Sequence, residues 1–137
     1  MVNVRLIIVD DDPATRGVLR LLAEELGAEV VAEADNGQTA IEQAVHHPAQ
    51  LMLMDVSMPV MGGFPAARYL RAHIPQMQII FMSQHNQKAY ADEALELGAK
   101  GYLVKASVAA DLGPAIQKVL DGETFVSSRV QFVHARP

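Results

Sequence analysis

Residues 51–63 read Leu-Met-Leu-Met-Asp-Val-Ser-Met-Pro-Val-Met-Gly-Gly, and this stretch decides the fold that we predict. Four apolar residues run directly into Asp55, which is typical of a buried strand that ends in a carboxylate. Pro59 and the pair Gly62-Gly63 then predict a loop. Because ligands bind at the carboxyl ends of the strands in open α/β sheets, we expect Asp55 to lie at a functional edge.

Four other apolar runs resemble this strand, and each of the five is followed by a stretch with helical periodicity. The predicted strands cover residues 4–9, 29–34, 51–54, 78–82 and 101–104. The predicted helices cover residues 13–26, 37–47, 64–73, 88–97 and 108–120, with Asp12 and Asn36 as caps of the first two. Crossovers of this length favour a parallel sheet with helices on both faces. The short strand 29–34 is flanked by acids and is expected at an edge.

Composition limits what such a domain does. The chain has 137 residues, a net charge of −5 and no cysteine. An acidic balance argues against binding of DNA or RNA by this chain itself, because phosphate contacts need a basic face. Without cysteine the chain has no disulfides, thiolate metal sites or thiol nucleophiles. No apolar run approaches the roughly 20 residues of a membrane span, so we expect a cytoplasmic protein with no membrane partner.

Polar groups follow four of the five predicted strands. The first strand leads into the acids of 10–12 and the third into Asp55, while the fourth leads into Ser83 and the fifth into Lys105. In a doubly wound sheet these four strand ends lie on one edge, so the groups are expected to meet in one shallow pocket.

The chemistry of these groups predicts a magnesium and phosphate site. Neighbouring carboxylates repel one another unless a cation neutralises them, and Mg²⁺ favours one or two carboxylates together with phosphate oxygens. Lys105 as a point charge and Ser83 as a hydroxyl donor suit phosphoryl oxygens. Asp55 beside a metal is then suited to act as a carboxylate nucleophile that forms an acyl phosphate.

The sequence resembles the receiver domain of bacterial two-component response regulators over about residues 3–122. Four stretches carry the resemblance, each at the end of a predicted strand: residues 6–13, 54–63, 81–83 and 98–105. The resemblance implies a flavodoxin-like (CheY-like) α/β fold with five helices and a five-stranded parallel sheet of order 2-1-3-4-5. The domain is expected to span residues 1–122, with residues 123–137 as a linker stub or flexible C-terminal tail.

The resemblance also implies a metal-dependent phosphorylation site. A sensor histidine kinase is the expected partner and Asp55 the residue that it phosphorylates. Mg²⁺ is the expected cofactor, held by Asp10, Asp11, Asp55 and the backbone carbonyl of Ser57. No enzyme activity is expected beyond the chain's own phosphotransfer and dephosphorylation.

Further roles follow from the same resemblance. Ser83 and Lys105 are expected to contact the phosphoryl group, and Tyr102 is expected to be an aromatic switch that follows the inward movement of Ser83. Gln84 stands at the rim of the pocket, where receivers commonly have a small residue, so we expect it to influence phosphoryl lifetime.

The most similar receivers are those of the NarL/FixJ (LuxR-type) DNA-binding regulators. Many receivers have proline after the lysine, whereas this chain has Ala106. Receivers of that class often lack this proline too. Residues 122–127 also look like the start of that class's linker. DNA would then be bound only by an output domain that is absent from this chain. A homodimer is possible through the face formed by residues 88–97, 101–104 and 108–120.

Two other functions are compatible with parts of the pattern. A haloacid-dehalogenase-type phosphatase also uses an aspartyl phosphate, and residues 10–12 offer its D-x-D motif. However, Pro13 and Ala14 follow without the usual Thr or Val, and Asp55 would have no role. A pseudo-receiver that binds partners without phosphorylation is the third reading, which the full set of acids, hydroxyl and lysine disfavours.

Overall fold

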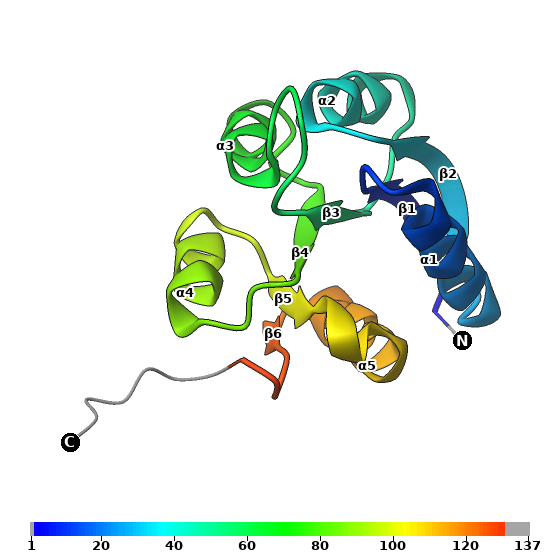
Figure 1. The fold of residues 1–137 in the computed structure, drawn as a ribbon. Helices are drawn as coiled ribbons and strands as arrows, with labels where there is room; N and C mark the ends of the chain where they lie inside the picture. Colours follow the sequence, from blue (N-terminus) through cyan, green and yellow to red (C-terminus); the bar gives the residue numbers. More distant parts are fainter. Residues whose placement is uncertain (1, 131–137) are drawn as a thin grey trace.

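The computed structural model describes residues 2–130 (Figure 1). The strands are Arg5–Val9 (β1), Glu29–Ala34 (β2), Leu51–Asp55 (β3), Gln78–Ser83 (β4), Gly101–Val104 (β5) and Phe125–Val126 (β6). The helices are Pro13–Glu25 (α1), Gly37–His46 (α2), Gly63–His73 (α3), Lys88–Glu96 (α4) and Val108–Leu120 (α5). A 3-10 turn, Lys105–Ser107, joins β5 to α5. None of the described helices is long and apolar enough to cross a membrane.

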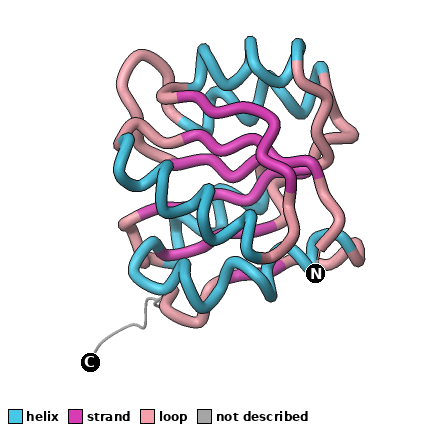
Figure 2. Tube along the Cα trace, turned by 90° about the vertical axis from the view of Figure 1, so that its right-hand side faces the viewer, coloured by secondary structure: helices cyan, strands magenta, loops and turns pink. Residues whose placement is uncertain are grey.

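All strand pairs are parallel, and the sheet has the order β2-β1-β3-β4-β5-β6. Figure 2 shows the strands side by side between helices. The predicted order of the first five strands is confirmed, as is the edge position of β2. The expected helices are also found, and the side chains of Asp12 and Asn36 cap α1 and α2 by accepting bonds from the backbone of Thr15 and Thr39.

The predicted count of five strands is wrong, because β6 adds a sixth beside β5. The backbone amides of Phe125 and Ser127 donate to the carbonyls of Lys100 and Tyr102, each at 2.9 Å. Without β6 the outer edge of β5 would have unpaired backbone groups. Two residues are too few to show the alternation of a strand in the sequence. Pairing with the edge of β5 is what makes this segment a strand.

A polar network holds the segment that follows β6. Ser127 is 2% exposed, and its hydroxyl donates to the Asp111 carboxylate at 2.7 Å. The Ser107 hydroxyl lies 2.8 Å from the same Asp111 carboxylate and 3.0 Å from the Ser127 hydroxyl. Residues 125–127 of the predicted tail therefore pack against β5 and the N-terminal end of α5. Residues 131–137 of that tail lie outside the described residues.

Two apolar layers cover the sheet. On one face, α1 and α5 pack on alternate strand residues such as Leu6, Leu53 and Met82. On the other face, α2, α3 and α4 pack on the intervening residues, such as Met54 and Phe81. Burial on both faces explains the continuous apolar character of the central strands. The rigid sheet leaves its carboxyl edge as the place where loops carry polar groups.

Gly63 fits directly beneath the end of β3. A Cβ atom at this position would collide with the carbonyl oxygen of Asp55 and lie 3.0 Å from Cε1 of Phe81. Gly17 in α1, by contrast, has nothing within 4 Å of an added Cβ. The first helical residue of α3 therefore has to be small for the Asp55 loop to close.

Exchanging these two glycines for alanine is expected to change stability in opposite directions. Gly63→Ala should lower the free energy of unfolding by about 1–3 kcal/mol through overpacking. Gly17→Ala should raise it by about 0.5–1 kcal/mol, because alanine favours the helix. Urea unfolding of both variants measures the difference. Equal effects would contradict the tight packing of Gly63 against β3.

Candidate functional site

The strand ends form one pocket because the parallel strands are in register. Val9 lies opposite Met54, Asp55 opposite Met82, and Ser83 opposite Val104, so the residues that follow share one edge. The resulting pocket has a volume of about 400 Å³ and is lined by Asp11, Asp12, Thr15, Asp55, Ser57, Ser83, Gln84, His85 and Lys105. Groups that were predicted from four separate strands therefore line a common space.

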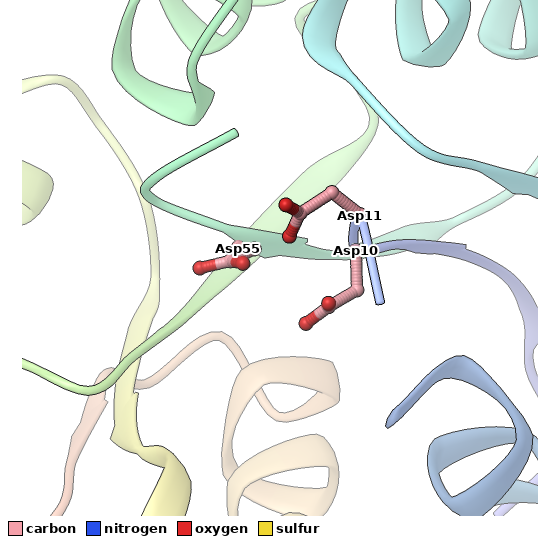
Figure 3. A group of neighbouring side chains, drawn as sticks. All are labelled: Asp10, Asp11 and Asp55. Carbon is pink, nitrogen blue, oxygen red and sulfur yellow. The ribbon is translucent and has the colours of Figure 1, made fainter. Parts of the chain in front are cut away.

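Three carboxylates lie together at the ends of β1 and β3 (Figure 3). One oxygen each of Asp10, Asp11 and Asp55 lies within 4.8 Å of the others. Asp10 is fully buried and Asp55 is 4% exposed, whereas Asp11 is exposed. Three like charges at this spacing repel one another strongly, so the cluster needs a cation.

Lys105 supplies one positive charge. Its Nζ donates to Asp55 Oδ2 at 3.0 Å and lies 2.8 Å from Asp10 Oδ2. Burial lowers the pKa of Lys105, but its close contacts with the carboxylates of Asp10 and Asp55 outweigh burial and raise this pKa above its ordinary value. Burial also raises the pKa of Asp55, against the opposing effect of Lys105. One ammonium thus serves two buried carboxylates and leaves the cluster with excess negative charge.

The donor set fits a hard divalent cation. Asp10 Oδ2 is buried and has no hydrogen-bond partner, since its contact with Lys105 does not have hydrogen-bond geometry. Asp11 adds an exposed carboxylate at the mouth of the pocket. Carboxylate oxygens on a partly open site are what Mg²⁺ prefers. Asp10, Asp11 and Asp55 are the residues that would hold it.

Ser57 lies on the wall of the pocket, two residues after Asp55. Its backbone amide donates to Asp55 Oδ1 at 3.3 Å, which helps to fix the orientation of that carboxylate. The use of its carbonyl as a metal ligand stays a prediction.

Ser83 and Tyr102 are linked through the backbone of His85. The Ser83 hydroxyl accepts from the His85 amide at 3.0 Å, and the Tyr102 hydroxyl donates to the His85 carbonyl at 2.7 Å. Tyr102 is fully buried, and this burial raises its pKa. The two residues that the resemblance assigns to a switch therefore share one loop segment, while the switching itself stays a prediction.

Two residues of the pocket wall were not predicted from the sequence. Thr15 lines the pocket and its hydroxyl donates to the capping carboxylate of Asp12 at 2.6 Å. His85 lines the pocket and stacks on Tyr90, with ring centroids 4.2 Å apart. Only their positions, three residues after Asp12 and two after Ser83, could have indicated them.

Gln84 lies exposed on the same wall, and its effect on phosphoryl lifetime stays a prediction.

The fold is a doubly wound parallel α/β sheet that carries an acidic pocket at its carboxyl edge. The family model described as response regulator receiver domain matches residues 6–117. The chain belongs to the response regulator receiver domain family, and its relatives are regulators of the LuxR/NarL type. This family is distinct from the phosphatases that the D-x-D pattern also allowed.

Curated relatives include transcriptional regulatory protein DegU of Brevibacillus brevis, which is 34% identical over 93% of this chain and 55% of its own length. Response regulator UvrY of Escherichia coli is 31% identical over 95% of this chain and 59% of its own length. The chain thus spans somewhat more than half the length of these relatives.

Solved structures give the same result. A LuxR-family two-component response regulator from Aurantimonas sp. superposes with a TM-score of 0.87 and 33% identity, over 94% of this chain and 93% of that one. The receiver domain of the putative response regulator NarL from Mycobacterium tuberculosis superposes with a TM-score of 0.80 and 33% identity, over 88% of this chain and 98% of that one.

Proposed function

We propose that this receiver takes a phosphoryl group from a phosphohistidine of a sensor kinase onto the carboxylate of Asp55. The observation that carries the proposal is the arrangement around Asp55. Its carboxylate is buried beside that of Asp10, contacts the ammonium of Lys105 at 3.0 Å, and opens onto a pocket that Ser83 also lines.

In this proposal each side chain has a distinct task. A carboxylate oxygen of Asp55 attacks phosphorus, the P–N bond to the imidazole breaks, and an acyl phosphate forms. Lys105 moves from its bond with Asp55 to a phosphoryl oxygen, and the Ser83 hydroxyl donates to another. Asp10, Asp11, Asp55 and the Ser57 carbonyl would hold Mg²⁺, which would supply further positive charge to the transferring group.

The proposed output follows from the loop that Ser83 and Tyr102 share. Movement of Ser83 toward a phosphoryl group would pull on His85, to which Tyr102 is bonded. We propose that this movement of the loop shifts an existing equilibrium between two conformations of the face formed by α4, β5 and α5. We propose that a second copy or an output domain pairs with this face, to which β6 now contributes.

Binding to DNA is proposed only for an output domain joined to this receiver. The proposed boundary is residue 122, beyond which the chain would lead through β6 into a linker. Solved relatives support such an arrangement. A structure of two RcsB dimers bound to two parallel DNAs superposes over 94% of this chain, with 26% identity and a TM-score of 0.86. The acidic net charge of −5 disfavours DNA contacts by the receiver itself.

The function is tested by adding a phosphorylated histidine kinase domain or a small acyl phosphate to the full chain. With Mg²⁺ present, intact mass spectrometry is expected to find one added phosphoryl group. With a chelator present, uptake is expected to be lost, because the carboxylate cluster then repels the phosphodonor. Failure with both donors, or equal uptake without Mg²⁺, would overturn the proposal.

A further inference from the structure

A salt-bridge network behind the site connects α1 and β2 to the backbone of Asp10. Arg16, in the first turns of α1, donates from Nη1 to the Asp10 carbonyl at 2.8 Å. Its Nε donates to Glu33 Oε1 on β2 at 3.2 Å. Arg20, one turn later, donates to the other oxygen of Glu33 at 2.6 Å. Glu33 therefore binds both arginines of α1, and Arg16 also donates to the backbone of Asp10.

The contact with Asp10 matters because of where that residue lies. The Asp10 amide donates to Ala34 of β2 at 3.0 Å, and one carboxylate oxygen accepts from the Asp12 amide at 2.9 Å. The bond from Arg16 fixes the remaining backbone group, the carbonyl that precedes Asp11. The peptide unit between Asp10 and Asp11 sets the direction of both side chains, and both carboxylates belong to the cluster with Asp55.

We propose that Arg16 is a positioning residue that holds the Asp10–Asp11 turn in the geometry that binds a divalent cation, with Glu33 orienting the guanidinium. The inference rests on the proposed metal site, since Arg16 does not line the pocket and acts only through the backbone of Asp10. Partners behind metal ligands typically affect affinity tenfold to hundredfold, which is about the size expected here.

An ordinary surface ion pair is the competing explanation. The side chains of Arg16 and Glu33 are 21% and 29% exposed, and exposed pairs contribute only about 0–1 kcal/mol. Such a pair would affect stability slightly and cation affinity only through its charge. Removal of a positive charge near three carboxylates strengthens the attraction for Mg²⁺. The two explanations therefore predict changes in opposite directions.

Arg5 offers a matched control at the other end of the same strands. Its Nη1 lies 3.4 Å from Glu29 Oε1, so it also bridges to β2, but it stands at the opposite end of β1 from Asp10 and its side chain is 47% exposed. Arg5→Gln and Arg16→Gln remove the same charge and the same kind of bridge. Only Arg16→Gln removes the bond to the Asp10 carbonyl.

The test is a Mg²⁺ titration of the full chain, followed by the amide NMR signals of Asp10, Asp11 and Asp55. Arg16→Gln is expected to weaken Mg²⁺ affinity about tenfold or more, and Arg5→Gln to leave it unchanged. Glu33→Gln keeps Arg16 but loosens it, and is expected to weaken affinity less. These three spectra also report whether each variant is folded.

The outcomes separate the two levels of the argument. A wild-type chain that does not bind Mg²⁺ would defeat the metal site and, with it, the proposed function. Wild-type binding with unchanged or tighter binding by Arg16→Gln would defeat only the positioning role. Weakening by Arg5→Gln as large as by Arg16→Gln would also defeat it, because the loss would then not depend on the bond to Asp10. If Arg16→Gln does not fold, Glu33→Gln is compared with Glu29→Gln, which removes the same charge at the other end of β2. Greater weakening in Glu33→Gln than in Glu29→Gln supports the proposal, and wild-type affinity or equal weakening in both variants defeats it.

Discussion

Asp55→Asn is expected to abolish phosphoryl uptake while raising the stability of the fold at neutral pH. The amide has no anionic oxygen to attack phosphorus, so uptake measured by intact mass should fall to zero. The amide also removes one of three neighbouring carboxylates from a buried site, and Lys105 keeps its 2.8 Å contact with Asp10. A functional residue that costs stability is typical of a site built for chemistry.

The pH dependence gives the sign of the stability change. Burial raises the pKa of Asp55 above its ordinary value, so the folded state holds this proton more tightly than the unfolded state. Stability from Asp55 is therefore full below the unfolded pKa of about 3.9 and is lost as pH rises through the raised folded pKa. The gain in Asp55→Asn should be largest at neutral pH and shrink at acid pH, as thermal unfolding across this range would measure.

Asp12→Asn is the matched control for the loss of charge. Asp12 lines the same pocket, and its carboxylate caps α1, a task that asparagine performs as well. This variant should keep phosphoryl uptake. Uptake by Asp55→Asn equal to that of the wild type would contradict the assignment of Asp55, and loss in Asp12→Asn would move the chemistry toward the first strand.

Lys105→Gln is the second change with a large expected effect. Lys105 contacts both buried carboxylates, and the phosphoryl group is proposed to replace Asp55 as its partner. Loss of a donor to developing negative charge typically slows chemistry by about 10²–10³-fold, so uptake at saturating Mg²⁺ should slow to this degree. Without Mg²⁺ the variant should also lose about 3 kcal/mol of stability, because two buried carboxylates are left uncompensated.

Lys118→Gln serves as the control for Lys105. The ammonium of Lys118 is exposed and pairs with Glu123 at 3.3 Å, so its loss should change neither uptake nor stability appreciably. Mg²⁺ is expected to restore part of the stability of Lys105→Gln, since binding to the folded state stabilises it. A wild-type rate of uptake in Lys105→Gln would contradict the role that we propose for its ammonium.

The sequence predicted the sheet well where strands are buried on both faces. The run that ends at Asp55 has no polar interruption, and the polar residues after each strand marked the carboxyl edge. β6 could not be predicted in this way, because Phe125 and Val126 follow the turn at Gly122 and are too few to show a period. The open edge of β5 determines their conformation, and an edge exists only in the folded sheet.

The sequence predicted which residues gather at the candidate site, but it did not predict how deeply each is buried or which backbone groups connect them. Asp10 and Asp11 are the same residue type, yet Asp10 is fully buried and Asp11 is exposed. Both follow the end of β1, and their side chains point in different directions from that turn (Figure 3). His85 joins Ser83 to Tyr102 through backbone groups, which no side-chain pattern reports. Arg16 reaches Asp10 through a contact between helix and strand, and only the folded chain brings the two together.

Chemical trapping tests the central claim most directly, namely that Asp55 forms an acyl phosphate in a Mg²⁺-dependent reaction. Borohydride reduces an acyl phosphate to an alcohol and leaves a free carboxylate unchanged, so it converts a phosphorylated aspartate to homoserine. After incubation with phosphodonor and Mg²⁺, peptide mapping is expected to find homoserine at position 55. Homoserine at position 10, 11 or 12 instead, or a phosphorylated chain without homoserine at position 55, would contradict the account.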